Sequence, residues 1–395
     1  MRAFGCLSLM FVLLLLSVSG PVKAGPLEDG QAAWAKGDYA TTLRLWRPLA
    51  AQGNANAQYN LGLMYANGQG VPQDDAEAVK WYGKAAVQGF AAAQSNLGFM
   101  YALGRGVTQD YAETLRWYRL AAKQGDAEAQ HSLGFMYAQG RGIAQDYAEA
   151  VKWFRLAAEQ GLAAAQNNLG LMYFKGAGVT QDYSEALRWF RPAAEQGFAE
   201  AQTSLGVMYA EGRGVPQDFA EAVKWYRLAA DQNYAAAQYN LGVRYASGQG
   251  VTRSDAEAVK WYRKAAVQGN AGAQYNLGVR YASGRGVPKD DAEGVKWYRK
   301  AAAQGYAEAQ HNLGVMYAGG RGVQRDDAEA VKWYRRAAEQ GFAGGQYGLG
   351  WMCAEGRGVP QDDAEAVKWY RKAAAQGNAD AKNALAEMRR QGRAK

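Results

Sequence analysis

The sequence predicts an all-α solenoid, and three observations lead to this fold class. A segment of 36 residues recurs nine times from Ala55 without an insertion or deletion. Within each copy, apolar residues follow the spacing of a helix, and glycine recurs where a helix should stop. A fixed period of about 20 to 50 residues is typical of stacked supersecondary units that share one continuous core.

Each copy is predicted to be a hairpin of two helices, and repeat positions are numbered here after the first copy. The first, or A, helix is expected from Ala57 to Asn67, because its apolar residues fall at i, i+4, i+7 and i+8. Gly68 and Gly70 recur in every copy after it, as expected for a left-handed C-terminal cap.

Gly62 recurs inside the A helix, where glycine should cost about 1 kcal/mol relative to alanine. A cost that recurs in nine copies implies a close approach of the second helix. We therefore expect Trp81 to pack over the bare backbone at Gly62.

The second, or B, helix is expected to begin at Asp74. Glu77 completes a capping box, in which each side chain accepts a hydrogen bond from a backbone amide at the helix start. Ser254 replaces Asp in one copy and is an equally good cap. Gly89 ends the B helix in every copy but one, and the exception is Asn233, the residue type that best tolerates the left-handed conformation.

The two ends of the sequence differ from the repeats. Residues 1–24 have the charged start, apolar run and small-residue cleavage site of a secretory signal peptide, with cleavage expected after Ala24. The alternative is an uncleaved membrane anchor, although an apolar run of about fifteen residues is short for a bilayer span. Residues 25–54 are expected to form a capping hairpin with Trp46 near the repeat tryptophan position, and residues 379–395 a capping helix with a basic tail.

The signal peptide predicts a periplasmic or secreted protein with no transmembrane segment after cleavage. The formal net charge of +8 can favour anionic surfaces, and the alternative is an ordinary solvated surface with charges of both signs interleaved along the helices. Nucleic acid is a poor partner for a protein in that compartment. Cys353 is the single cysteine of the expected mature chain, so no intramolecular disulfide is possible. Its place on the core face predicts a buried, inert thiol.

The sequence predicts no catalytic residue, metal site or cofactor. Its two histidines, His131 and His311, occupy the same repeat position and are interpreted as surface residues, because no other ligand stands at metal-binding spacing. The Gly-x-Gly-Val loops follow a helix rather than a strand, so they do not fit the dinucleotide fingerprint. The Asp-x-x-Glu pairs recur in eight of the nine copies and are explained as helix caps, whereas a catalytic pair usually occurs once in a chain.

The copies resemble the Sel-1-like repeat family of tetratricopeptide-like solenoids. The resemblance rests on AQYNLGLMYANGQGVPQDDAEAVKWYGKAAVQG at residues 57–89 and assigns nine repeats to residues 55–378. It implies a right-handed α/α superhelix with a concave face, which acts as a scaffold or adaptor for proteins. Bacterial members are often exported and serve in envelope assembly, signalling or host interaction. A cysteine-rich branch is linked to penicillin binding and hydrolysis, but this sequence lacks its cysteine pairs, so a hydrolase is the more remote alternative.

Function is expected at repeat positions that vary, and positions 59, 63 and 66 lie opposite the core residues of the A helix. In solenoids of this kind the A helices line the concave face. The partner-binding prediction comprises Tyr59, Tyr239, Arg244, Tyr275, Arg280, Tyr347 and Trp351. Its centre is the set Tyr239, Arg244, Tyr275 and Arg280, where two arginines would hold an anion between aromatic walls. The alternative is a tolerant surface, with position 63 half-buried between neighbouring A helices.

The B helices become more basic along the chain. The last four copies carry three basic residues at positions 80, 83 and 84, as in Lys260, Arg263 and Lys264, where the first five carry two. Glutamates at i, i+3 offset many of these charges. This pattern leaves a second kind of ligand open, namely an anionic envelope polymer such as peptidoglycan or acidic polysaccharide.

Overall fold

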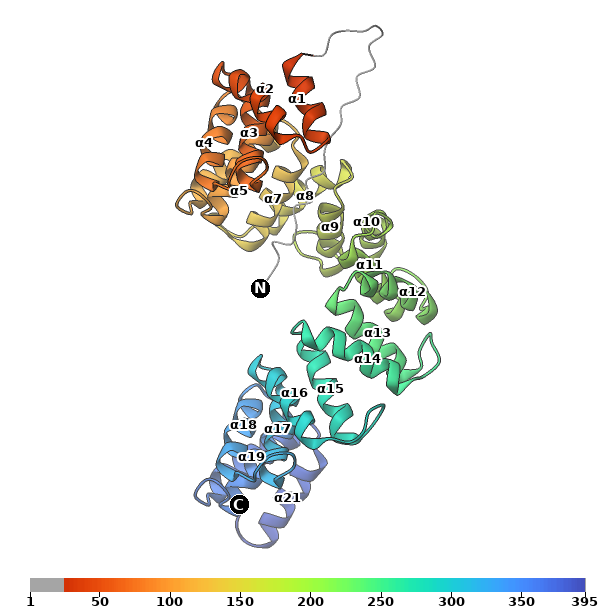
Figure 1. The fold of residues 1–395 in the computed structure, drawn as a ribbon. Coiled ribbons are helices and arrows are strands. Elements are labelled where there is room, and N and C mark those ends of the chain that lie inside the picture. The colour runs from red at the N-terminus through yellow and green to blue at the C-terminus, as the bar shows by residue number, and fades with distance from the viewer. Residues whose placement is uncertain (1–24, 395) are drawn as a thin grey trace. The chain divides into compact units, whose positions relative to one another are not determined.

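The structure is a computed structural model that describes residues 25–394 (Figure 1). Within this range it contains 21 α-helices in consecutive hairpin pairs and no strand, so the predicted all-α solenoid of helix hairpins is confirmed. None of these helices is both long and apolar enough to cross a membrane. The predicted signal peptide lies outside the described residues. The described part of the chain divides into two compact units, with the boundary between Leu133 and Gly134.

The first unit contains the N-terminal hairpin and the first two repeats. The hairpin consists of α1 (Pro26–Ala35) and α2 (Tyr39–Ala51), and the repeats of α3 (Ala55–Asn67), α4 (Asp75–Val87), α5 (Ala91–Leu103) and α6 (Tyr111–Lys123). The division between the units falls inside α7 (Ala127–Gln139), which is the A helix of repeat 3. The A helix of the first repeat, α3, begins at Ala55, two residues earlier than the predicted start at Ala57.

The second unit continues the same alternation of A and B helices. Its helices are α8 (Tyr147–Glu159), α9 (Ala163–Lys175), α10 (Tyr183–Glu195), α11 (Ala199–Glu211), α12 (Phe219–Asp231), α13 (Ala235–Ser247), α14 (Asp255–Val267), α15 (Ala271–Ser283), α16 (Asp291–Ala303), α17 (Ala307–Gly319), α18 (Asp327–Glu339), α19 (Ala343–Glu355), α20 (Asp363–Ala375) and α21 (Ala379–Arg390).

Of the two hydrogen bonds of the predicted capping box, the B helices form only the one accepted by the N-cap side chain. The Asp74 carboxylate accepts from the Glu77 backbone amide at 3.0 Å. The reciprocal bond is replaced, because the Asp74 amide donates to the Tyr65 carbonyl at 2.9 Å. Glu77 instead pairs with Lys80, one turn further along the helix. The predicted role of the glutamate as a second cap is therefore wrong, and the loop itself satisfies that amide.

The glycine inside each A helix faces a ring of the B helix, but the ring is Tyr82 and not Trp81. A Cβ placed on Gly62 would lie 2.5 Å from Cδ1 of Tyr82. The same contact recurs with Phe190 over Gly170 and with the equivalent rings of the other repeats. Trp46, expected near the repeat tryptophan position, instead packs over Gly30 as Tyr82 packs over Gly62.

The loop after the A helix needs glycine for two reasons. Gly106 has φ +69°, and a Cβ there would also collide with the carbonyl of Asp75 at the start of the preceding B helix. A side chain would therefore push neighbouring hairpins apart. At the end of the B helix the prediction for Asn233 is confirmed: it has φ 65° and is the one non-glycine residue with positive φ in the described range.

A ladder of buried glutamines joins successive hairpins. Gln238 is 1% exposed, and its amide donates to the Ala230 carbonyl of the preceding B helix at 3.2 Å. Its oxygen accepts from Gln268, at the end of its own B helix, at 2.7 Å. Because a buried amide without a partner is costly, this pair fixes each A helix between two B helices. Lys382 stands at this position in α21, where the ladder ends.

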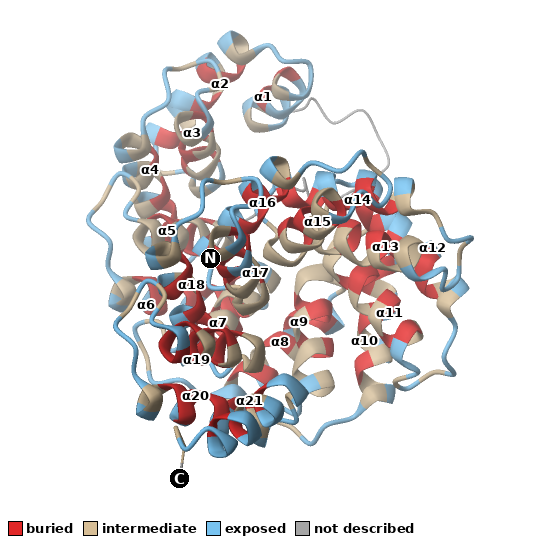
Figure 2. Cartoon of the chain, turned by 90° about the horizontal axis from the view of Figure 1, so that it is seen from below, coloured by how far each residue is buried: buried red, intermediate tan, exposed pale blue. Residues whose placement is uncertain are grey.

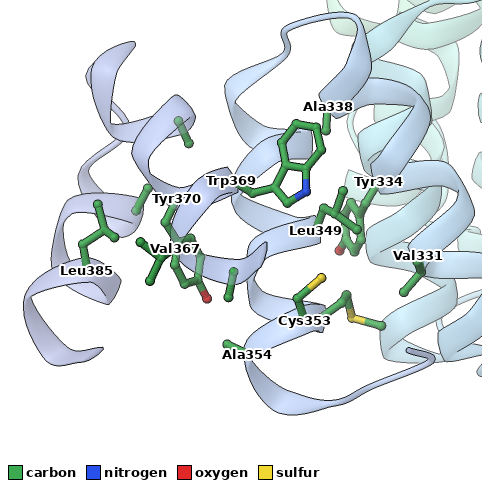
Figure 3. Packing of buried hydrophobic residues seen from close by; sticks show 14 of the residues in the cluster. Val331, Tyr334, Ala338, Leu349, Cys353, Ala354, Val367, Trp369, Tyr370 and Leu385 are labelled. Atoms are coloured by element: carbon green, nitrogen blue, oxygen red, sulfur yellow. The ribbon is translucent and has the colours of Figure 1, made fainter. Parts of the chain in front are cut away.

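The core follows the helices, while the connecting loops are exposed (Figure 2). Near the C-terminus, Leu349 and Cys353 of α19 pack against Trp369 and Tyr370 of α20 (Figure 3). Leu385 of α21 belongs to the same cluster and covers its outer side. The last helix thus completes the core of the repeat before it.

Candidate partner-binding surface

The A-helix stripe is defined here as repeat positions 59, 63 and 66 of the A helices. At position 59 its aromatic residues are half-buried, not fully outward. The Tyr275 ring lies between the rings of Tyr298 on its own B helix and Tyr306 before the next A helix, with centroids 6.1 and 5.2 Å away. Burial raises the pKa of Tyr275. The predicted tyrosines therefore offer an edge to solvent and are held in place from behind.

The other aromatic residues of the predicted site have similar surroundings. Tyr347 lies 5.7 Å from Tyr370 between ring centroids. At position 63, Trp351 is half-buried, and the Arg357 guanidinium lies 4.5 Å from the centre of its ring. The tyrosines Tyr59 and Tyr239 pack on their own B helices in the same way. Such pre-ordered rings lose little side-chain entropy when a partner binds.

Arg280 already has an internal anionic partner. Its side chain is 10% exposed, and Nη1 donates to the Asp255 carboxylate of the preceding repeat. Burial raises the pKa of Tyr262 to about 12, and the nearby charge of Arg280 opposes this effect. Since Asp255 satisfies the guanidinium, the predicted role of Arg280 as an anchor for a partner's anion is withdrawn.

Arg244 and Tyr239 lie on one helix but contact different neighbours. The Arg244 guanidinium lies 5.3 Å from the centre of the Phe219 ring, and Nη1 donates to Gln249 Oε1 at 2.7 Å. The Tyr239 ring packs 6.1 Å from that of Tyr262. The predicted four-residue cluster is therefore not assembled as a single anion site.

Both histidines occupy position 59 and are packed, so their interpretation as surface residues is wrong. Burial lowers the pKa of His131 to about 4. The His311 ring lies 5.6 Å from Tyr334 and 5.5 Å from Phe342, and burial lowers its pKa as well. Position 59 is thus a packing position whichever residue fills it.

Cys353 is 3% exposed, as predicted for a structural thiol, and burial raises its pKa. A thiol with a raised pKa stays protonated at neutral pH and is a poor nucleophile. Within residues 25–394, no group of three or more His, Cys, Asp or Glu side chains could hold a metal ion.

The cations of the basic B helices are largely matched within the protein. Lys260 pairs with Glu257 at 3.2 Å, and the same i, i+3 pair recurs in other B helices. The third cation of the later repeats lies over tryptophan, as in Lys264, whose Nζ is 4.3 Å from the centre of the Trp261 ring. The added charges therefore also serve as packing for the tryptophan face.

A pocket of about 190 Å³ lies between α9 and α11 in the A-helix layer. The residues that line it are Leu171, Phe174, Phe190, Thr203, Ser204 and Val207. Four of them belong to the A-helix stripe. Sequence reasoning did not single out this place, although Phe174 is a signal, because position 66 is alanine in the other eight copies.

The polar atoms of this pocket are satisfied by the helix that carries them. Thr203 Oγ1 donates to the Ala199 carbonyl at 2.8 Å, and Ser204 Oγ donates to the Glu200 carbonyl at 3.0 Å. The hydroxyl hydrogens are thus unavailable to a ligand. What the pocket presents is ring and methyl surface, which suits an apolar side chain.

Comparison with known proteins identifies the repeat. The Sel1 repeat family matches nine successive segments, residues 55–90, 91–126, 127–162, 163–198, 199–234, 235–270, 271–306, 307–342 and 343–378. A search of curated proteins found no match.

Two solved structures resemble the whole chain. One is c5321, a protective antigen present in uropathogenic Escherichia coli strains displaying an SLR fold; it is 39% identical with a TM-score of 0.76, over 94% of this chain and 80% of that one. The other is a Sel1 repeat protein from Oxalobacter formigenes, 31% identical with a TM-score of 0.56, over 95% of this chain and 98% of that one.

Proposed function

The chain belongs to the Sel1 repeat family, and on this premise we propose that it is an exported scaffold that binds a protein partner through its A-helix stripe. The observation that carries the proposal is the construction of the stripe. Half-buried aromatic edges from successive A helices are fixed by packing from behind, as Tyr275 is by Tyr298 and Tyr306. Rigid aromatic residues of this kind dominate binding energy at protein interfaces.

The role of a scaffold also fits the chemistry of the variable positions. The residues that recur serve caps, close helix contacts and the glutamine ladder, so they are occupied by folding. The variable residues at positions 59 and 63 of the stripe are aromatic, aliphatic, small polar or histidine side chains, and none is Asp, Glu, Lys or Arg. We therefore propose a non-catalytic role, with the stripe as the recognition surface.

The experiment uses the full chain as bait against the envelope fraction of the producing organism, followed by affinity measurements on the captured protein. The double variant Tyr275→Ser, Trp351→Val changes the stripe to residues that other copies carry at the same positions. Folding should survive, and affinity should fall about tenfold or more. A stripe variant that binds as tightly as the wild type would refute the proposal.

The matched control changes the opposite layer in the same way. Leu156 and Leu228 are 44% and 50% exposed on B helices, and Leu156→Lys, Leu228→Lys copies Lys264 of a later repeat. This variant should change affinity by less than about twofold. If it weakens binding more than the stripe variant does, the recognition surface is on the B helices.

An anionic envelope polymer is the alternative ligand, and salt distinguishes it from a protein. Binding through the basic B helices should weaken steeply as ionic strength rises, whereas a stripe of aromatic residues should bind with little salt dependence. A penicillin-binding hydrolase is the remaining alternative, which steady turnover of a β-lactam, lost on a single substitution, would establish.

Export is proposed from residues 1–24 and supported by the E. coli relative, which is described as a protective antigen. Mass spectrometry of the protein purified from the periplasm or medium should find a mature N-terminus at or next to Gly25. Retention of Met1 in the exported protein would contradict cleavage.

A further inference from the structure

Three residues in or near the pocket between α9 and α11 are smaller than their counterparts two repeats later. At the corresponding positions repeats 6 and 7 carry Tyr239 and Tyr262, whose ring centroids are 6.1 Å apart, and Asn276, whose side chain lies near the Tyr262 hydroxyl. In repeats 4 and 5 the same positions are occupied by the smaller residues Asn167, Phe190 and Ser204.

A fourth substitution gives the pocket an additional aromatic wall. Phe174 replaces the alanine of the other copies, and its ring lies 6.4 Å from Phe190 and 5.3 Å from Tyr183 between centroids. The guanidinium of Arg213 covers the outer side, 5.2 Å from the centre of the Phe174 ring. Side chains are therefore smaller at three positions near the site, and a rigid ring has been added at a fourth.

The volume of the pocket selects the size of its occupant. Pockets that hold drug-sized molecules or cofactors measure about 300–1,000 Å³, and about 190 Å³ is well below that range. An apolar cavity of about 150 Å³ is large enough for a benzene ring. The pocket therefore fits one aromatic or branched aliphatic side chain.

The charged residues near the pocket-lining residues in the sequence favour one kind of group beside that side chain. Lys175 follows Phe174 at the end of α9, is exposed, and has no ion pair within 4.0 Å among the described residues. Arg213 is matched by Glu211 at 2.7 Å, so Lys175 is the unmatched charge at this end. Glu200 lies at the opposite end, in the first turn of α11. An anion next to the occupant is thus favoured at the end near Lys175.

We infer that this pocket is the anchor site for an extended segment of a protein partner, which inserts one aromatic or branched aliphatic side chain and places a carboxylate beside Lys175. The inference rests on the proposed function and narrows it to one place on the stripe. A single deep anchor surrounded by shallower contacts is a common arrangement at protein interfaces.

The test uses small probes on the full chain, with the methyl NMR signals of Leu171, Thr203 and Val207 as the readout. N-acetylphenylalanine should shift these signals with an affinity in the millimolar range, whereas N-acetylalanine should not. The amide of N-acetylphenylalanine should bind about two- to fivefold more weakly, because it lacks the anion. The variant Lys175→Gln should abolish that difference.

The matched variant fills the pocket with residues of this same chain. Asn167→Tyr, Phe190→Tyr, Ser204→Asn copies Tyr239, Tyr262 and Asn276, so the protein should stay folded and the probe-induced shifts should disappear. Persistent shifts in this variant, equal shifts with N-acetylalanine, or no shifts in the wild type would each overturn the site. If N-acetylphenylalanine and its amide bound with equal affinity, the predicted contact between a carboxylate of the partner and Lys175 would be wrong.

The test of the pocket and the test of the proposed function can fail independently of each other. If a captured partner depends on Tyr275 and Trp351 but binds the filled variant normally, the scaffold role stands and the pocket is not its anchor. If the pocket takes the probe but no stripe variant affects a captured partner, the pocket stands and the proposed function fails.

Discussion

Repeats 4 and 5 and repeats 6 and 7 share one backbone plan but differ where their A helices meet. The glycine of each A helix faces a ring at the same distance, since a Cβ would lie 2.7 Å from Phe190 at Gly170 and 2.7 Å from Tyr262 at Gly242. Yet a pocket lined by Phe174 lies in the first pair, whereas the second carries alanine at that position and has Tyr239 packed against Tyr262. The solenoid thus keeps its spacing constant through the recurring residues while a few variable ones change its surface.

The largest expected effect tests whether the two regions share their scaffold. Gly170→Ala and Gly242→Ala should each destabilise the protein by about 1–3 kcal/mol, because the new methyl group meets a ring that is itself buried. Chemical denaturation measures both. Gly83→Ala is the control, since its Cβ would meet no atom within 4 Å, and it should stabilise by up to about 1 kcal/mol. Unequal losses at Gly170 and Gly242 would show that the scaffolds differ.

The next effect tests the difference itself. The double variant Tyr239→Asn, Asn276→Ser should cost about 1–2 kcal/mol, because the ring contact between Tyr239 and Tyr262 and the packing of Asn276 beside it are lost. Filling the pocket of repeats 4 and 5 should be neutral or stabilising by less than about 1 kcal/mol. Thermal melts of the two variants measure both changes in stability. Equal destabilisation would mean that the residues around the pocket are optimised for packing alone.

A smaller effect separates the repeats by pH. At repeat position 75, repeats 8 and 9 carry Asp327 and Asp363, which bind Arg357 and Arg393, whereas repeats 4 and 5 carry Tyr183 and Phe219. The hydrogen bond from Arg357 holds the pKa of Asp327 below its usual range, and that from Arg393 does so for Asp363.

Because these folded-state pKa values are depressed, the stabilisation is present above the unfolded pKa of about 3.9 and is lost as pH falls through the folded pKa. As the pH is lowered, hydrogen exchange should therefore show that the backbone amides of α18–α21 lose protection before those of α10–α12. Asp327→Asn should cost about 1 kcal/mol at neutral pH and remove its share of the acid sensitivity. Simultaneous loosening of both regions would argue against this role.

The smallest effect concerns the two arginines at position 64. Arg280→Met should cost about 1 kcal/mol, because Asp255 loses its most buried partner while Arg285 remains at 3.5 Å. Arg244→Met should change stability by less than about 0.5 kcal/mol, since methionine stands at this position in the other copies. Denaturation curves that rank the two in the opposite order would reverse the interpretation of their contacts.

Features that depend on short stretches of chain could be predicted from the sequence. The hairpins, the Asp74 cap and the left-handed Asn233 follow from residues within a few positions of one another, where backbone geometry leaves little choice. The assignment of Trp81 to the glycine failed because Trp81 and Tyr82 both recur in the copies, and periodicity alone does not decide which neighbour faces the A helix.

The contacts of the candidate site residues could not be predicted from the sequence, because the residues around them come from other repeats. Arg280 meets Asp255 across 25 residues, so its partner depends on the register between hairpins. The pocket is lined by residues of two A helices and the B helix between them, among them Phe190, Thr203 and Ser204, which are smaller than their counterparts two repeats later. Each substitution is small when seen alone, and only their juxtaposition in space makes a cavity.

The most direct test of the account is to exchange the two regions and follow the pocket. In one protein, repeats 4 and 5 receive Asn167→Tyr, Phe174→Ala, Phe190→Tyr, Thr203→Tyr and Ser204→Asn. Repeats 6 and 7 receive the reverse changes Tyr239→Asn, Ala246→Phe, Tyr262→Phe, Tyr275→Thr and Asn276→Ser. With N-acetylphenylalanine as the probe, methyl shifts should disappear at Leu171 and appear at Val243, its counterpart. Shifts that remain at Leu171, or that appear in neither region, would contradict the claim that these few positions decide what the A-helix stripe binds.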